Sequence, residues 1–302
     1  MALVGRWSGY IEREGAMGLS TVMQTALSGM SAATTIIDVA ANNLANTQTR
    51  GFKASSVRLA TLAPQTMSLA GGLGSNPIQF GSGVQVVGVD SDFSQGPISA
   101  SDQLPLLALD GEGLFILQAS GGERLYTRDG QFHLSADGEL VTADGDRVLG
   151  FGVDAEGRID RSELTPLAIR LGSAAVGPLG TAAILRSYSI GKNGGIVGRY
   201  SDGLNRTLGQ LRLARFANPA GLAARAGNKF ASTPASGLPT ESDPGSAVTA
   251  EIVSGATELS NVDIGRELIE LTLAGNLFQA NLAVFRTADN LLGELFFPWR
   301  VQ

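Results

Sequence analysis

Both ends of the chain carry long apolar helical patterns with almost no charge, and this feature restricts the possible folds more than any other. Residues 19–46 are predicted to form one helix, in which Asp38 is the only charged residue. Apolar side chains recur there at alternating spacings of four and three residues, which is typical of a coiled-coil seam. The seam consists of Met23, Leu27, Met30, Thr34, Ile37, Ala41 and Leu44. A second stripe of small groups runs beside it and consists of Val22, Ala26, Gly29, Ala33, Ile36 and Ala40. A lone solvated helix would present a charged face, so we expect this helix to be covered by other helices.

A second such helix is predicted over residues 262–296, and Pro298 ends it. No charged residue occurs from Leu271 to Phe285. The first apolar stripe includes Leu268, Leu271, Phe278, Leu282, Phe285 and Leu292, and a second stripe includes Leu273, Leu277, Val284 and Leu291. Because two stripes need two partners, we predict that the terminal helices pair with each other and then pack against other copies. The alternative is a pair of core helices buried in one globular domain.

The middle of the chain has the pattern of short antiparallel strands. Between residues 76 and 165, Asp-Gly pairs recur at close spacing, which is the strongest short-range signal for hairpins. Strand patterns return after residue 186, whereas residues 170–187 are small, rich in glycine and alanine, and expected to form a loop. The predicted fold class is therefore α+β, with an antiparallel β-rich central domain inserted between N- and C-terminal coiled-coil helices that pair with each other.

The same patterns predict the domain boundaries. Charged residues interrupt residues 1–16, and a better amphipathic pattern begins at Met17. The predicted parts are a disordered N-terminal extension over 1–16, an N-terminal helical part over 17–60, a linker over 61–75, the β-rich domain over 76–254 and a C-terminal helical part over 255–302.

Composition excludes several classes of function. The net charge of −6 provides no basic field for a phosphate backbone, so no nucleic-acid partner is expected. The chain has no cysteine, which excludes a disulfide scaffold and thiolate chemistry. No secretory signal and no uninterrupted apolar run of about 18 residues is found, so no membrane insertion is predicted. Charged residues make up only 17% of the chain, which indicates a surface covered by something else.

No catalytic constellation is found in the sequence. His133 is the only histidine, and neither a nucleophile elbow nor a zinc-binding motif accompanies it. The glycines around Ser82 precede an apolar strand and not a helix, so they do not form a phosphate cradle. We therefore predict no catalytic residue, no cofactor, no metal and no enzymatic activity. A secreted β-rich adhesin or binding module, which would be a self-contained monomer, is one alternative of another class.

Two short motifs resemble the signatures of one family, the flagellar hook and basal-body rod proteins. The first lies over residues 41–53 and the second at the start of the last helix. The matching residues are Asn42, Asn43, Leu44, Asn46, Thr49, Gly51, Phe52, Lys53, Ser260, Asn261 and Val262. Independently of the resemblance, the asparagines are expected to bond free carbonyls at the helix end, and Gly51 to take a left-handed backbone in a turn packed by Phe52.

The resemblance implies a structural role. The middle of the chain is most similar to hook proteins, although residues 170–187 are too short for the outer domain that hook proteins insert there. The resemblance to hook proteins implies that the chain is a hook subunit, which self-assembles into a hollow helical tube and transmits torque from motor to filament. The alternative within the family is a distal or proximal rod protein of the basal body.

The resemblance also implies partners and a location. The partners are other copies in a helical tube, other flagellar axial proteins (rod, hook and junction proteins) and the flagellar type III export apparatus. The location is the flagellar hook or basal body, outside the cell or spanning the periplasm, reached without a cleaved signal peptide.

Overall fold

The computed structural model describes residues 4–67, 78–101, 105–154, 157–172, 174–176, 182–246 and 249–296. The chain forms two compact units. The helical unit comprises residues 1–45, 55–90 and 263–302, and the β unit comprises residues 46–54 and 91–262.

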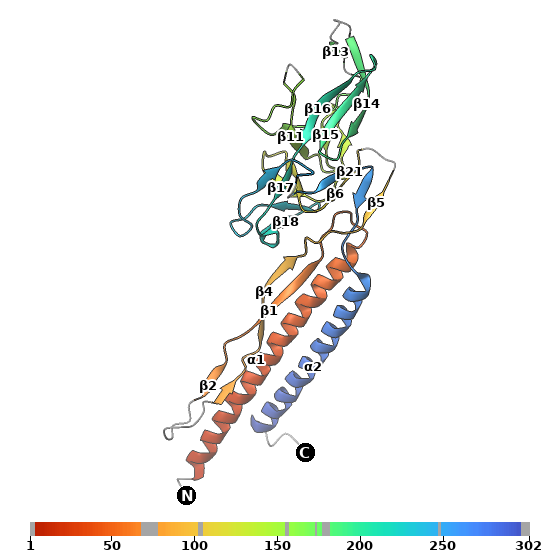
Figure 1. The fold of residues 1–302 in the computed structure, drawn as a ribbon. Helices are drawn as coiled ribbons and strands as arrows, with labels where there is room; N and C mark the ends of the chain where they lie inside the picture. The colour runs from red at the N-terminus through yellow and green to blue at the C-terminus, as the bar shows by residue number, and fades with distance from the viewer. Residues whose placement is uncertain are drawn as a thin grey trace. The chain divides into compact units, whose positions relative to one another are not determined.

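Two long helices form the frame of the helical unit. Helix α1 spans Val4–Ala45, helix α2 spans Ile264–Phe296, and the two pack along each other (Figure 1). The carboxylate of Asp263 accepts hydrogen bonds from the backbone N–H groups of Gly265 at 2.8 Å and Arg266 at 3.2 Å. Asp263 is therefore the N-cap that fixes where α2 begins.

Four short strands complete the helical unit. Strand β1 (Ser55–Thr61) pairs with β4 (Val84–Ser91) to form a two-stranded ribbon, and β2 (Gln65–Met67) pairs with β3 (Ile78–Phe80). Strand β1 lies beside α1. The hydroxyl of Ser28 on α1 accepts a hydrogen bond from the backbone N–H of Val84 at 3.2 Å, so α1 contacts the ribbon along a face next to the one that meets α2.

The β unit contains the remaining strands, and within the described residues they pair in antiparallel fashion. They are β5 (Ile98–Ala100), β6 (Leu107–Asp110), β7 (Leu114–Gln118), β8 (Arg124–Thr127), β9 (His133–Leu134), β10 (Leu140–Val141), β11 (Arg147–Phe151), β12 (Thr165–Pro166), β13 (Ala174–Val176), β14 (Ala182–Ile190), β15 (Gly195–Tyr200), β16 (Asn205–Leu211), β17 (Leu213–Arg215), β18 (Ala223–Arg225), β19 (Lys229–Ala231), β20 (Thr240–Ser242), β21 (Glu251–Ser254) and β22 (Ala256–Glu258). A 3-10 turn at Pro219–Gly221 lies between β17 and β18.

One sheet dominates the β unit. In the described residues its main path runs β13-β14-β15-β16-β11-β7-β8-β19-β18, while β6 pairs with β21 and β5 with β22. Its core is apolar, with Phe115, Leu117, Leu211 and Leu213 fully buried. The ring of Phe115 meets that of Phe132 edge to face, with centroids 5.1 Å apart. Alternating apolar positions of short strands thus supply the core, as the hairpin pattern predicted.

The predicted α+β class is confirmed, but several predicted boundaries differ. The part of residues 1–16 that the structure describes, from Val4 on, continues α1 and is not a disordered extension. The N-terminal helix ends at Ala45, so the predicted helical part over 17–60 also contains strand β1. The predicted linker over 61–75 contains β2, and its residues 68–75 lie outside the described residues.

Two boundaries around the β domain also shift. Residues 76–90 group with the helices and not with the β unit, which instead takes in residues 46–54 and ends at Val262. The predicted loop over 170–187 contains β13 and the first half of β14, because small apolar side chains also suit a paired strand.

Candidate functional site

Asn43, in the first family motif, links three segments of the helical unit. Its side-chain amide donates to the backbone carbonyl of Ser55 at 2.8 Å and to the Glu267 carboxylate at 3.1 Å, and its side-chain oxygen accepts from the Ser55 N–H at 2.9 Å. Asn43 is buried. The prediction that its side chain bonds the free carbonyls at the helix end is wrong, because its donors and acceptor are used by β1 and α2.

The turn that follows α1 behaves as predicted at Gly51. Its φ is +63°, and an added Cβ would lie 2.7 Å from the backbone nitrogen of Asp129. Both the left-handed backbone and this close approach require glycine. Upstream, the hydroxyl of Thr49 donates to the side-chain oxygen of Asn46 at 3.0 Å. Phe52, half-buried, closes the turn through its N–H, which donates to the Thr49 carbonyl at 3.3 Å.

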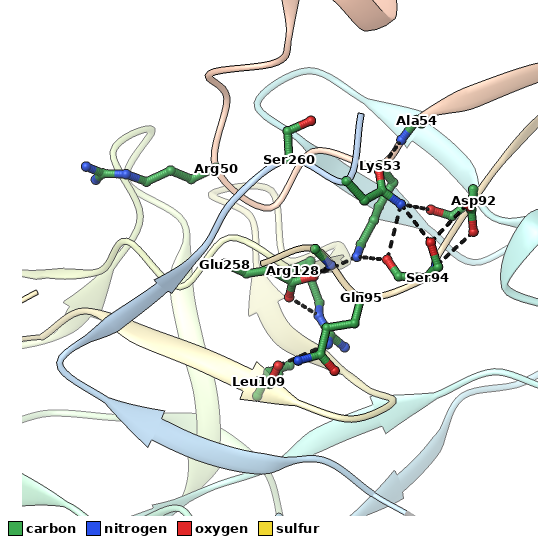
Figure 2. Close-up of polar contacts among 12 residues, drawn as sticks. Arg50, Lys53, Ala54, Asp92, Ser94, Gln95, Leu109, Arg128, Glu258 and Ser260 are labelled. Carbon is green, nitrogen blue, oxygen red and sulfur yellow. Dashed lines mark hydrogen bonds and ion pairs between the residues drawn. The ribbon is translucent and has the colours of Figure 1, made fainter. Parts of the chain in front are cut away.

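Lys53 ends the first motif in a buried ionic network that is shown in Figure 2. Its ammonium donates to the Glu258 carboxylate at 2.7 Å and to the carbonyl of Ser94 at 2.6 Å. The same carboxylate accepts from the N–H of Gly96 at 2.9 Å and from Nε of Arg128. The Glu258 side chain is 0% exposed. One carboxylate thus joins residues 53, 96 and 128, which come from three separate parts of the chain.

The remaining donors of Arg128 are also satisfied. Its Nη1 donates to the carbonyl of Gly113 at 2.6 Å, and its Nη2 donates to those of Leu109 at 3.1 Å and Gly111 at 2.6 Å. Two buried cations face one buried anion, and burial lowers the pKa of Lys53 from its ordinary value, against the opposing effect of its hydrogen bond to Glu258. The backbone carbonyls that accept hydrogen bonds from Lys53 and Arg128 therefore also stabilise these two buried positive charges.

The second motif closes the same junction. The side-chain oxygen of Asn261 accepts from the N–H of Ala54 at 2.7 Å, and its amide donates to the carbonyls of Asp92 at 2.9 Å and Ser94 at 3.2 Å. The Ser260 hydroxyl accepts from the Val262 N–H at 3.3 Å. The two motifs therefore meet where the chain enters and leaves the β unit, and this meeting point is called the motif junction below.

The helix pair is built on small residues and not on the predicted seam of α1. Ala26, Ala33 and Ala40 are buried, and an added Cβ on Gly29 would lie 2.7 Å from the side-chain amide of Asn281. The predicted residues Met23, Met30, Ile37 and Leu44 are half-buried, while Leu27 is exposed. Small side chains let the two backbones approach closely, which is why the alanine stripe, and not the larger seam, lies at the contact.

On α2 most of the predicted seam residues are half-buried. Ala274 and Ala288 are the buried apolar positions among its described side chains. The predicted residues Leu271, Phe278, Leu282, Phe285 and Leu292 are half-buried, whereas Leu268 is exposed. The pairs Gly29–Asn281 and Asn43–Glu267 show that the helices run antiparallel.

Several large apolar side chains of α2 are exposed among the described residues. Leu273, Leu277, Val284 and Leu291 are between 46% and 58% exposed. The sequence contains no uninterrupted long apolar run, yet in the described residues α2, over Ile264–Glu294, is long and apolar enough by length and composition to cross a membrane. The core helix of a soluble protein meets the same criterion of length and composition.

No arrangement for catalysis accompanies these surfaces. In the parts of the chain that the structure describes, no three His, Asp or Glu side chains are grouped to hold a metal ion. His133 is exposed at the end of the short strand β9. The buried charged groups are instead used to join chain segments. The described part of the chain thus combines a β unit that has a buried core with a helix pair in which α2 leaves large apolar side chains exposed.

Comparison with known proteins identifies the class. Three family profiles match: flagella basal body rod protein over residues 23–53, flagellar hook protein FlgE/F/G D1 domain over 108–198, and flagellar basal body rod FlgEFG protein C-terminal over 253–296. The flagellar basal-body rod protein FlgG of Borreliella burgdorferi is 32% identical over 277 residues, covering 89% of this chain and 95% of that protein. FlgG of Bacillus subtilis is 31% identical and covers 90% and 97%.

The chain belongs to the family of flagellar hook and basal-body rod proteins, which are structural and not enzymatic. It is therefore a subunit of the flagellar axial structure. The flagellar hook protein FlgE of Salmonella typhimurium is 40% identical over 111 residues, but these cover 37% of this chain and 28% of that protein. The family assignment removes the adhesin alternative.

Sequence reasoning missed Glu258, Arg128 and Glu267. Each is a charged residue of ordinary appearance in the sequence, and burial alone reveals its role. Only their positions in the sequence could have indicated Glu258 and Arg128. Glu258 precedes the second motif by two residues, and Arg128 lies next to the Asp129-Gly130 turn.

Proposed function

We propose that this chain is a subunit of the basal-body rod and not of the hook. The observation that carries the proposal is coverage: rod proteins named FlgG align along almost the whole chain, whereas the hook relative aligns over little more than a third of it. The short segment between β12 and β14 supports the same choice, since it holds no outer domain of the kind expected for a hook subunit. The sequence-based preference for the hook is corrected accordingly.

The proposed mechanism is mechanical. Copies of the chain assemble with one another and with neighbouring axial proteins, and the resulting tube carries torque. The exposed apolar stripe of α2 supports self-assembly, because each large apolar side chain that becomes buried contributes about 1.5–3 kcal/mol. Passage through the flagellar export apparatus, and a final position that spans the periplasm or lies outside the cell, belong to the same proposal.

The test is to delete the gene and image purified basal bodies by electron microscopy. Loss of a rod subunit should shorten or remove part of the rod, and no hook should follow. If complete rods remain and only the hook is missing, the result contradicts the rod proposal and favours a hook subunit.

Complementation separates assembly from folding. A Leu277→Asp variant, altered on the exposed stripe of α2, should fail to restore the rod. The matched control is Leu238→Asp, because Leu238 is 89% exposed and lies in the β unit. We expect that control to restore the rod, and equal behaviour of both variants would count against α2 as the assembly surface.

A further inference from the structure

The turn between β14 and β15 contains Asn193, the only asparagine of the sequence that is followed by glycine. Its side chain is exposed, and the turn is closed by the N–H of Gly194, which donates to the carbonyl of Gly191 at 2.9 Å. Gly194 has a φ of +75° and no Cβ, so its backbone nitrogen can approach the preceding side chain closely. The turn therefore places a backbone nucleophile next to a side-chain amide.

The same turn activates that amide. The side-chain oxygen of Asn193 accepts a hydrogen bond from the N–H of Gly195 at 3.2 Å. A donor at this position polarises the amide carbon Cγ and stabilises the negative charge that develops on the oxygen when a nucleophile adds. Within the described residues the amide nitrogen Nδ2 makes no hydrogen bond, so it can leave as ammonia into the solvent.

Two other asparagines of the β unit lack these features. The amide nitrogen of Asn218 donates to the carbonyl of Ala235 at 3.0 Å, and the next residue is a proline, which has no N–H. The amide nitrogen of Asn228 donates to the carbonyl of Arg50 at 2.9 Å, and the next residue is a lysine, whose Cβ hinders close approach. An exposed amide, an activating donor and an unhindered nucleophile thus occur together at Asn193.

We propose that Asn193 is a site of spontaneous covalent modification in the folded chain. The backbone nitrogen of Gly194 attacks Cγ of Asn193 and gives up its proton, the bond from Cγ to Nδ2 breaks, and ammonia leaves. The product is a five-membered cyclic imide. One water molecule then opens the ring at either of its carbonyl carbons, which gives aspartate or isoaspartate at position 193. Water is the only co-reactant, and each conversion adds one negative charge.

The hydrogen bond that closes the turn sets the rate. It holds the proton that Gly194 must lose, so we expect the folded chain to react more slowly than an open peptide of the same sequence. The exposed amide still allows reaction without unfolding of the β unit. This rate order separates modification in the folded turn from modification that occurs only in unfolded molecules.

The aspartate product fits the fold. Asp137-Gly138 and Asp202-Gly203 already form turns of the same kind, in which the glycine N–H donates to the carbonyl three residues earlier at 2.9 and 3.0 Å. Aspartate at position 193 can therefore keep the hydrogen bonds of the turn.

The isoaspartate product does not fit, because it adds a methylene group to the main chain. The carbonyls of residues 192–194 are all used by other segments. They accept from the N–H of Ile252 at 3.0 Å, the side-chain amide of Gln210 at 3.0 Å and the N–H of Leu211 at 2.8 Å. Isoaspartate also turns the middle carbonyl into a free carboxylate. We therefore expect this product, and not aspartate, to lower the unfolding midpoint of the β unit.

The test follows the folded full chain in mildly alkaline buffer over weeks by peptide mapping with mass spectrometry. Isoaspartate is distinguished from aspartate by retention time and by labelling with a protein isoaspartyl methyltransferase. The unfolded chain in urea and a synthetic peptide of residues 191–195 are followed in parallel. Asn193→Gln is the matched variant, since its longer side chain disfavours ring closure, and Asn218 is the control within the same sample.

The proposal expects Asn193 to react before any other asparagine of the folded chain, to give both products, and to react more slowly than in urea. Asn193→Gln should remove the modification. An Asn193 that stays intact in the folded chain after the peptide has reacted fully would overturn the proposal. Earlier reaction at Asn218, or at the Asp137-Gly138 turn, would also overturn it.

A second measurement tests the difference between the products. Asn193→Asp should unfold at the same urea concentration as the unmodified chain, whereas the isoaspartate fraction should unfold at a lower one. Equal midpoints for all three would contradict the role given to the carbonyls of residues 192–194. None of these outcomes bears on the rod assignment, which depends on the basal bodies of the deletion strain.

Discussion

Glu258 shows at the residue scale how one side chain can organise a junction. Its carboxylate lies between the Lys53 ammonium and the Arg128 guanidinium, and all three side chains are nearly inaccessible to water. Removing the anion would leave two buried cations with only carbonyl partners. Removing one partner of a buried ionic group is far more harmful than removing the whole group, because the remaining charge keeps its desolvation cost.

We predict that Glu258→Gln lowers the free energy of unfolding of the β unit by about 3–5 kcal/mol. The matched control is Glu251→Gln, since the Lys192–Glu251 pair is mostly exposed and its loss should cost less than about 1 kcal/mol. Urea denaturation followed by circular dichroism measures both. Equal, small effects of the two variants would show that the carbonyls alone suffice to hold Lys53 and Arg128.

Glu267 gives the helix pair a dependence on pH. Burial raises the pKa of its carboxyl, with a further increase from Glu270, while the hydrogen bond from Asn43 opposes the shift. The second carboxylate oxygen, Oε2, is buried with no hydrogen-bond partner in the described residues. Between the ordinary value of 4.5 and the raised pKa, the folded state binds more protons than the unfolded state. The stability of the pair is therefore greatest below that window and falls as pH rises through it.

We predict that Glu267→Gln stabilises the helix pair at neutral pH by about 1 kcal/mol, because the amide keeps the acceptor for Asn43 and removes the charge. The variant should also lose the decline in stability that the unmodified chain shows as the pH rises from 4.5 through the raised pKa of Glu267. Urea denaturation monitored at a helix wavelength across this range is the measurement. Glu294→Gln, at an exposed position of the same helix, is the control and should keep the decline.

At this scale the sequence predicted residues whose role is local. Gly51 was identified because a left-handed turn needs glycine whatever its surroundings are. The part played by Asn43 was predicted wrongly, since its partners, Ser55 and Glu267, are decided by packing between separate segments. Glu258 and Arg128 could not be found, because nothing in the neighbouring residues marks a charge that will be buried.

At the scale of elements, α1 and α2 approach each other closely at Gly29. Gly29 lies against the amide of Asn281, which itself donates to the carbonyl of Leu277 at 2.9 Å. This contact and the Asn43–Glu267 hydrogen bond lie along the same helix pair and together hold one antiparallel register. Polar groups placed within an apolar helix contact are known to fix register in this way.

We predict that Gly29→Val destabilises the helix pair by about 1–3 kcal/mol through overpacking against Asn281. Gly275→Ala is the matched control on α2, because an added Cβ there meets nothing within 4 Å. That control should stabilise the helix by about 0.5–1 kcal/mol through helix propensity. Thermal unfolding by circular dichroism compares the two, and a stabilising effect of Gly29→Val would contradict the close packing.

Element types could be predicted because the helices are long and strongly periodic and the hairpins carry Asp-Gly turns. The stripe of small residues on α1 was visible in the sequence, but nothing there showed that Ala26, Ala33 and Ala40 would be buried in place of the larger seam residues. The small residues of 170–187 gave no strand signal, although pairing between β13 and β14 is satisfied by backbone groups alone.

At the scale of the whole molecule, the two units differ in how their apolar groups are covered. The β unit has a core of fully buried side chains, whereas α2 packs along α1 and leaves large apolar side chains exposed. Local opening is easiest where few apolar contacts are buried. The sequence predicted this division into helical ends and a β-rich middle, but not that residues 76–90 belong with the helices, because their strands are short like those of the β unit.

We predict that limited proteolysis of the isolated full chain removes the helical ends first and leaves a resistant product that contains residues 91–262. Intact mass at successive times measures this order. In the assembled polymer the helices should become as resistant as the β unit, because neighbours then cover them. Isolated helices that resist cleavage as long as the β unit does would show that they are already covered within one molecule.

The residues of the motif junction lie far apart in the sequence, so they become available at different times when the chain is presented from its N-terminus. Lys53 and Glu258 are separated by 205 positions in the sequence, and Arg128 and Glu258 by 130. Any process that presents the chain from its N-terminus delivers both cations long before the anion that joins them, and closing so large a loop is slow. Until Glu258 is present, Lys53 and Arg128 lack the anion that joins them. A chain that ends before β22 lacks Glu258 and therefore cannot form this ionic network.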